Sequence, residues 1–193
     1  MKILLICYQF DLNNSPRAYR WQSIVTFLRS QNNQVDVVCK KCNNNNNYAV
    51  NTSNSNARIF NKNTITKKVL KFIYRKTWRL LYWPDSACLW FFNGYFQSKK
   101  LLNINTYDML ITVSHPFTCH LIGYFLKKKH PALNWRVDIG DPFSFLKDIY
   151  LNNRLLYRYL NSIAEKKVLF LVDKIFVTTT SLLEKYVKEW HLF

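Results

Sequence analysis

The chain has 193 residues, of which 49% are hydrophobic and 17% aromatic, and this composition indicates a folded domain and excludes a disordered chain. Its 28 Lys and Arg outnumber its 11 Asp and Glu and give a formal net charge of +17, so its surface should attract anions such as phosphates, acidic lipids or nucleic acid. No apolar run reaches the roughly 18 residues of a membrane span, and the first one is too short for a signal peptide. We therefore expect a cytoplasmic protein, free or peripheral on the inner face of the cell membrane. Five cysteines, an odd number at irregular spacing, predict reduced thiols.

The first part of the chain predicts a βαβ unit. Residues 2–8 are a continuous apolar run, which is typical of a strand buried on both faces. A helix is predicted over residues 17–31, with Ser15 as its cap, and a second strand over Gln34–Cys39. The Asn-rich segment 40–63 has little to bury and predicts a flexible surface loop.

A basic amphipathic helix is predicted over residues 64–83. Apolar residues recur on one side at three- and four-residue spacing, which favours packing of that side on the core. The alternative is a segment that lies on an anionic membrane surface. The residues that would then face the membrane are Lys67, Lys68, Lys71, Arg75 and Arg79.

The rest of the chain alternates helices and strands. In order, we predict a helix over 89–102, a strand over 108–113, a helix over 117–129, the strand Trp135–Ile139, a helix over 152–171, the strand Lys174–Val177 and a helix over 181–190. In the helix 152–171 the inward side is expected to carry Leu155, Leu156, Tyr159, Ile163, Val168 and Leu169. This order of elements predicts an α/β fold, a Rossmann-like parallel sheet flanked by helices.

Polar side chains follow two of these strands where each strand ends. His115 comes just after the strand 108–113, while Asp138 and Asp141 lie at and just after the end of the strand Trp135–Ile139. The carboxyl ends of parallel strands meet at one edge, so these side chains should converge on one ligand-binding cleft. Each also has a structural explanation: Asp141 as a turn former before proline, Asp138 as a buried hydrogen-bond acceptor, and His115 as a structural histidine.

Several classes of site are excluded by what the sequence lacks. The chain has three glycines and none of them lies in the first strand–helix loop, which argues against the phosphate-binding loops of nicotinamide, flavin and P-loop proteins. Cys39 and Cys42 form a lone CxxC without a second pair, so we expect no metal site.

Six stretches, taken in order, resemble a known family. They are KILLICYQF, SPRAYRW, WPDSACLW, YDMLITVSHPFTCHLIGYFLKKK, WRVDIGDPFSF and EKKVLFLVDKIFVTTTSLLEKY. Their order and spacing resemble the N-terminal, acceptor-side domain of retaining family-4 glycosyltransferases of the GT-B fold. The resemblance covers nearly the whole chain outside residues 40–63, which would make residues 1–193 a single domain.

The resemblance implies roles for several residues. Asp141 would be catalytic, orienting or deprotonating an acceptor hydroxyl, at a place where many relatives have a histidine. Relatives often have Gly-Gly in the first loop, where this chain has Asn13, Asn14 and Ser15. The residues expected to bind substrate are His115, Ser114, Asp138, Asn14, Ser15 and Arg17.

The resemblance also implies partners. The nucleotide-sugar donor would be bound by a C-terminal domain that this sequence does not supply, so we expect no cofactor on this chain and weak or no transfer by the chain alone. The acceptor would be a glycan or a lipid-linked intermediate of cell-surface polysaccharide or glycolipid synthesis. One alternative is a non-catalytic binding or membrane-docking module derived from such an enzyme. A nucleic-acid binder is less favoured, because the basic residues are scattered over several helices without a recognisable motif.

Overall fold

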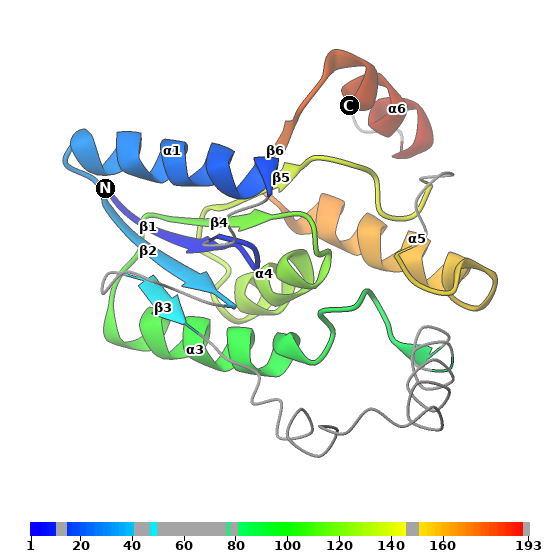
Figure 1. The fold of residues 1–193 in the computed structure, drawn as a ribbon, viewed down its shortest axis with the longest axis horizontal. Coiled ribbons are helices and arrows are strands. Elements are labelled where there is room, and N and C mark those ends of the chain that lie inside the picture. The colour runs from blue at the N-terminus through cyan, green and yellow to red at the C-terminus, as the bar shows by residue number, and fades with distance from the viewer. Residues whose placement is uncertain (11–14, 41–46, 50–76, 78–80, 146–150, 191–193) are drawn as a thin grey trace, which may run out of the picture.

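The structure is a computed structural model, and it describes residues 1–10, 15–40, 47–49, 77, 81–145 and 151–190. The described residues form six strands and five helices (Figure 1). In chain order these are β1 (Lys2–Ile6), α1 (Pro16–Ser30), β2 (Gln34–Cys39), β3 (Asn47–Ala49), α3 (Trp90–Ile104), β4 (Met109–Val113), α4 (Thr118–Lys129), β5 (Trp135–Ile139), α5 (Arg154–Leu171), β6 (Lys174–Val177) and α6 (Thr180–Trp190).

The strands make one parallel sheet in the order β3-β2-β1-β4-β5-β6. The predicted α/β class with a Rossmann-like parallel sheet is confirmed. In this order the chain builds outward from β1 in one direction and then from β4 in the other. Folds of this kind bind ligands at the carboxyl ends of the strands where the order reverses, which here lies between β1 and β4.

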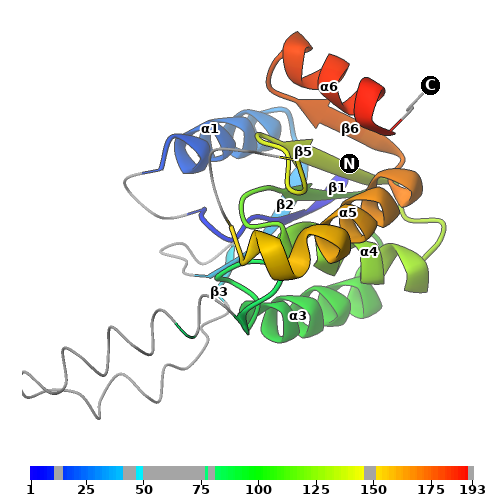
Figure 2. The same ribbon diagram turned by 90° about the vertical axis from the view of Figure 1, so that its right-hand side faces the viewer.

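Both faces of the sheet are covered by helices, α1 on one side and α3, α4 and α5 on the other (Figures 1 and 2). Because side chains alternate along a strand, Ile3 and Leu5 pack under α1 while Leu4 and Ile6 pack toward the other helices. Burial on both sides explains the continuous apolar run of β1. Each fully buried aliphatic side chain of this kind stabilises the fold by about 1.5–3 kcal/mol.

Side-chain oxygens accept from the first turns of several helices; at α1 the acceptor is local in sequence, whereas at α4 it is distant. Ser15 Oγ accepts from the backbone N–H of Ala18 at 3.4 Å, as predicted for the start of α1. At α4 the buried Asp85 accepts from the backbone N–H of Thr118 at 3.0 Å and from its hydroxyl at 2.8 Å. Burial raises the pKa of Asp85, and these hydrogen bonds oppose the rise.

Three expectations need correction. The segment 40–63 is not a loop throughout, since Asn47–Ala49 pairs with β2 as β3 and takes up the backbone hydrogen bonds of that edge. In α5, Leu155, Leu156 and Tyr159 do not face the core: their exposed fractions are 99%, 60% and 79%. Cys39 is disulfide-bonded, whereas Cys7, Cys88 and Cys119 are free thiols.

The reason for the α5 error is the position of the helix. Its first turns extend beyond the carboxyl ends of the strands (Figure 1), so nothing in the sheet lies beneath them. The turns that do cross the sheet bury Ala164, Val168 and Leu169. The rest of the segment 40–63 lies largely outside the described residues. The same holds for Lys67, Lys68, Lys71, Arg75 and Arg79 of the predicted basic helix.

Candidate functional site

Two loops at the carboxyl edge of the sheet, one after β4 and one after β5, are tied together by hydrogen bonds. The backbone N–H of Ser114 donates to the carbonyl of Asp138 at 3.0 Å, and the N–H of Gly140 donates to Ser114 Oγ at 3.0 Å. The peptide bonds on both sides of His115 are cis. These contacts fix the loops beside the start of α1, next to the reversal point of the strand order.

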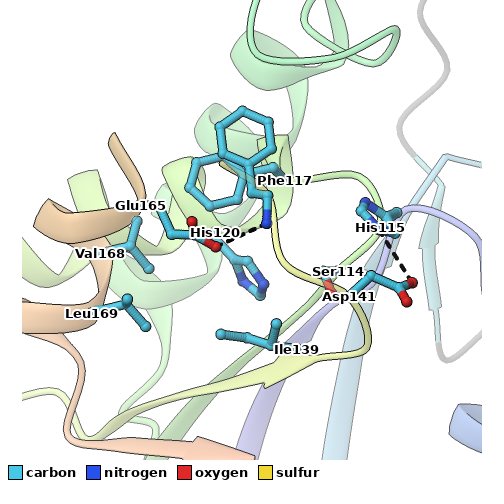
Figure 3. Close-up of a pocket in the computed structure, with 10 residues that line it drawn as sticks. Ser114, His115, Phe117, His120, Ile139, Asp141, Glu165, Val168 and Leu169 are labelled. Atoms are coloured by element: carbon cyan, nitrogen blue, oxygen red, sulfur yellow. Dashed lines mark hydrogen bonds and ion pairs between the residues drawn. The ribbon is translucent and has the colours of Figure 1, made fainter. Parts of the chain in front are cut away.

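Three charged or ionisable side chains meet at this edge. Asp141 Oδ2 lies 3.4 Å from Arg17 Nη2. It also lies 3.4 Å from His115 Nε2, the contact drawn in Figure 3. The Asp141 side chain is 44% exposed, against 23% for Arg17 and 19% for His115. Charge-assisted hydrogen bonds are usually about 2.7–2.9 Å long. The Asp141 carboxylate is therefore loosely held and open to solvent.

Burial is the largest influence on the pKa of His115. Desolvation and the nearby Arg17 guanidinium lower the pKa of His115, and Asp141 only partly opposes them. The imidazole is thus neutral at pH 7, so one ring nitrogen can donate and the other can accept. Among the described residues neither nitrogen has a partner with hydrogen-bond geometry.

Gly140 allows Arg17 to reach this position. A Cβ atom at residue 140 would lie 2.7 Å from Arg17 Nη2, which is closer than real Cβ contacts. The carbonyl of Gly140 accepts from the Thr178 hydroxyl at 3.3 Å, which ties the loop to the end of β6. Because glycine has no Cβ atom, the Arg17 guanidinium can approach the backbone of the loop closely.

Asp138 has a different environment from Asp141. It is buried, and its Oδ2 accepts from the indole N–H of Trp21 at 2.7 Å and forms an ion pair with Arg20. Both partners belong to α1, so the carboxylate fastens that helix to the end of β5. Its hydrogen-bonding capacity is directed into the protein and away from the open edge.

Glu165 of α5 also stabilises the loop after β5, by accepting hydrogen bonds from its backbone. This fully buried carboxylate accepts from the backbone N–H groups of Phe143 at 2.9 Å and Ser144 at 3.0 Å. It also accepts from the hydroxyls of Ser144 and Tyr186, the latter at 2.6 Å. Burial raises the pKa of Glu165, and these donors oppose the rise. Glu165 thus positions the segment that carries Asp141.

A small pocket lies between this loop, α4 and α5 (Figure 3). The residues that line it are Ser114, His115, Phe117, His120, Ile139, Asp141, Phe143, Glu165, Val168 and Leu169. His120 Nδ1 lies 2.8 Å from Thr112 Oγ1, and its Nε2 has no partner among the described residues. Burial lowers the pKa of His120 to about 3, so its ring is neutral.

The predicted site residues thus fall into three groups. Ser114, His115, Asp141 and Arg17 come together at the edge. Ser15 lies nearby but caps α1, and Asp138 lies behind the edge. Asn14 is outside the described residues.

Two supporting residues were not predicted from the sequence: Trp21 and Glu165. The sequence feature that could have indicated a role for Glu165 is that it is the single acidic residue of helix α5. Trp21 gave no such indication, because a helix that packs on a sheet commonly carries a tryptophan, whereas Arg20 follows the first loop, where an arginine could meet an acidic group. Their pairing with Asp138 depends on how α1 crosses the sheet.

The site has the chemistry of one carboxylate, one neutral imidazole and one guanidinium. Such a set can accept a hydrogen bond from a hydroxyl and can bind an anion. In the part of the chain that the structure describes, no cluster of three or more His, Cys, Asp or Glu side chains could hold a metal ion. No helix in that part is long and apolar enough to cross a membrane.

The fold and site define a Rossmann-like α/β domain with a charged, half-exposed edge. Comparisons with protein-family models and with curated proteins find no match for this chain. A more specific function must therefore be argued from the residues themselves.

Proposed function

We propose that this chain is the acceptor-binding domain of a retaining, nucleotide-sugar-dependent glycosyltransferase that acts in cell-surface polysaccharide or glycolipid synthesis. The observation that carries the proposal is the Asp141 carboxylate, which is 44% exposed between Arg17 and His115 at the edge where such folds bind ligands. The resemblance of six ordered sequence stretches to that family supports the same assignment.

In this proposal each edge residue has a separate role. Asp141 accepts the hydrogen bond of the reacting acceptor hydroxyl, and it orients the hydroxyl or takes its proton. Arg17 binds an acidic group of the acceptor, such as a phosphate, by moving from its 3.4 Å contact with Asp141. His115, held neutral by its lowered pKa, hydrogen-bonds a second acceptor hydroxyl.

The proposed reaction needs a second domain that binds the nucleotide-sugar donor. That domain would face the carboxyl edge of the sheet, so that donor and acceptor meet near Asp141. By this proposal the 193 residues alone transfer no sugar, and activity appears when the donor-binding half is supplied.

The test is a transfer assay with a radiolabelled nucleotide-sugar and a lipid-linked glycan acceptor, with and without a donor-binding half. Asp141→Asn is expected to lower the rate of the complete enzyme by about 10²-fold or more, the usual effect of losing a general base. Glu184→Gln is the matched control, since it removes an exposed carboxylate on α6. Transfer by the 193-residue chain alone would contradict the need for a second half.

A non-catalytic binding module is the second candidate. The observation that favours it is that Asp141 already contacts two cationic or ionisable partners within its own chain, as a turn-forming aspartate can. The same assay separates the two functions. If Asp141→Asn and Glu184→Gln give the wild-type rate, Asp141 has a structural role and the binding module is the better assignment.

A further inference from the structure

A connected group of aromatic rings covers the outer side of α3 and α4. Phe91 stacks on Tyr95 with ring centroids 5.9 Å apart, and it meets Phe92 at 5.5 Å and Phe125 at 5.6 Å. The group is extended by Phe96, 5.6 Å from Tyr95, and by Tyr124, 5.3 Å from Phe125. Helices α3 and α4 pack against each other, so these rings form one surface.

Much of this surface is open to solvent. The exposed fractions are 60% for Phe92, 60% for Phe96 and 47% for Phe125. Large side chains of this kind are normally buried, and a contiguous exposed group marks a contact site in soluble proteins. Phe91, Tyr95 and Tyr124 pack partly against the core, so the exposed part of this surface is formed mainly by Phe92, Phe96 and Phe125.

Lysines border the rings, and helices α3 and α4 themselves carry no carboxylate. The sequences of α3 and α4 contain five lysines and no Asp or Glu. Only Lys127 turns inward, to Asp173 at 2.7 Å, whereas Lys128 lies over the Tyr124 ring at 5.7 Å. Lys99 lies so close to Lys129 that contact with its amine and like-charge repulsion lower the pKa of Lys129. The border of the aromatic group therefore carries positive charge that no described carboxylate neutralises.

We propose that this aromatic–lysine face, formed by Phe91, Phe92, Tyr95, Phe96, Lys99, Lys100, Tyr124, Phe125, Lys128 and Lys129, docks onto an anionic lipid membrane. Aromatic side chains enter the headgroup region while lysines at the same surface meet acidic headgroups. Charge decides against a second copy of the chain, because a symmetric contact through this face would bring lysines opposite lysines.

The inference does not depend on the proposed transferase activity. It rests on α3 and α4, which lie on the opposite side of the sheet from α1, whereas the candidate site uses α1 and the loops after β4 and β5 (Figures 1 and 2). Membrane binding can therefore be measured on the isolated chain without any acceptor or donor.

The experiment is co-sedimentation of the full chain with vesicles of phosphatidylcholine alone or of equal parts phosphatidylcholine and phosphatidylglycerol. We expect the wild-type chain to bind the anionic vesicles and to be released by high salt. Phe92→Ser with Phe96→Ser should weaken binding about tenfold. Lys128→Gln with Lys129→Gln should weaken it roughly 25-fold, since each lysine near an acidic surface contributes about fivefold.

Matched controls separate this face from general surface charge and hydrophobicity. Phe27→Ser removes a 63% exposed ring from α1, and Lys166→Gln with Lys167→Gln removes two adjacent exposed lysines from α5. Both controls should bind as the wild type does, and circular dichroism should show all variants folded, because the replaced side chains are exposed.

Three results would overturn the proposal. One is equal binding of the wild-type chain to both vesicle types, or to neither. Another is anionic-vesicle binding by the face variants that matches the controls. The third is self-association of the wild type, seen by analytical ultracentrifugation and abolished by Phe92→Ser with Phe96→Ser, which would make a second copy the occupant.

Discussion

Asp138 and Asp141 are three residues apart on one strand-to-loop connection, yet their surroundings are opposite. Asp138 is buried and paired with Trp21 and Arg20, whereas Asp141 is 44% exposed with two contacts of 3.4 Å. Glu165, which contacts the same loop, resembles Asp138 in being buried and in accepting hydrogen bonds from within the protein. A buried carboxylate must satisfy several donors and so fixes a structure, while a loosely held one stays available to a ligand.

The largest loss of stability is expected on substitution of Glu165. Glu165→Ala leaves the backbone N–H groups of Phe143 and Ser144 and the Tyr186 hydroxyl without their acceptor. We expect the free energy of unfolding, measured by urea denaturation, to fall by about 3–5 kcal/mol. Glu165→Gln keeps one acceptor oxygen and should lose less. A loss below about 1 kcal/mol for the alanine variant would show that this carboxylate does not hold the loop.

The same substitution at the two aspartates tests the comparison directly. Asp138→Ala leaves the buried Trp21 indole N–H without an acceptor and removes the partner of the partly exposed Arg20. It should cost about 2 kcal/mol in urea denaturation. Asp141→Ala removes only two long, half-exposed contacts and should change stability by less than about 0.5 kcal/mol. Equal losses would remove the distinction between the two carboxylates.

The pH dependence of stability should reveal the buried His120. Its pKa of about 3 in the folded chain lies below its ordinary value of 6.5, so the unfolded chain takes up a proton first as the pH falls. The contribution of His120 is therefore fully present above pH 6.5 and is lost as the pH falls toward 3, with a slope of about 1.4 kcal/mol per pH unit. The raised pKa of Glu165 acts in the opposite direction over its own range.

His120→Asn isolates this contribution. The variant should have a stability-versus-pH curve with a shallower slope than the wild type between pH 6.5 and about 4, whatever its absolute stability. Urea denaturation across that range measures both slopes. Parallel curves would mean that His120 titrates alike in the folded and unfolded chains.

A small change in stability is also expected at Gly140. In Gly140→Ala the new Cβ would meet only the mobile end of Arg17, so stability should change by less than about 1 kcal/mol while the Arg17–Asp141 contact opens. Gly123→Ala is the buried counterpart, because its Cβ would lie 2.6 Å from the enclosed Trp135 ring. That variant should lose about 1–3 kcal/mol by overpacking. Thermal unfolding compares the two, and a greater loss at Gly140 would contradict a flexible Arg17.

Much of the fold could be predicted because helices and strands leave different periodicities of apolar residues in the sequence. The limits of β2, β5 and β6 match the prediction to the residue. The errors lie where local pattern and tertiary position disagree. Leu155 has the periodicity of a buried residue, but its turn of α5 passes beyond the sheet. The strand Asn47–Ala49 has weak strand propensity and is defined by its pairing with β2.

The candidate site divides in the same way. The sequence alone determined that His115 and Asp141 follow neighbouring strands, and parallel topology then brings them to one edge. Only the tertiary structure decided that Asp138 is enclosed by Trp21 and Arg20 while Asp141 stays open. The physical reason is that the order of elements is encoded by local periodicity. The desolvation and hydrogen-bond partners of a side chain are set by segments distant in the chain.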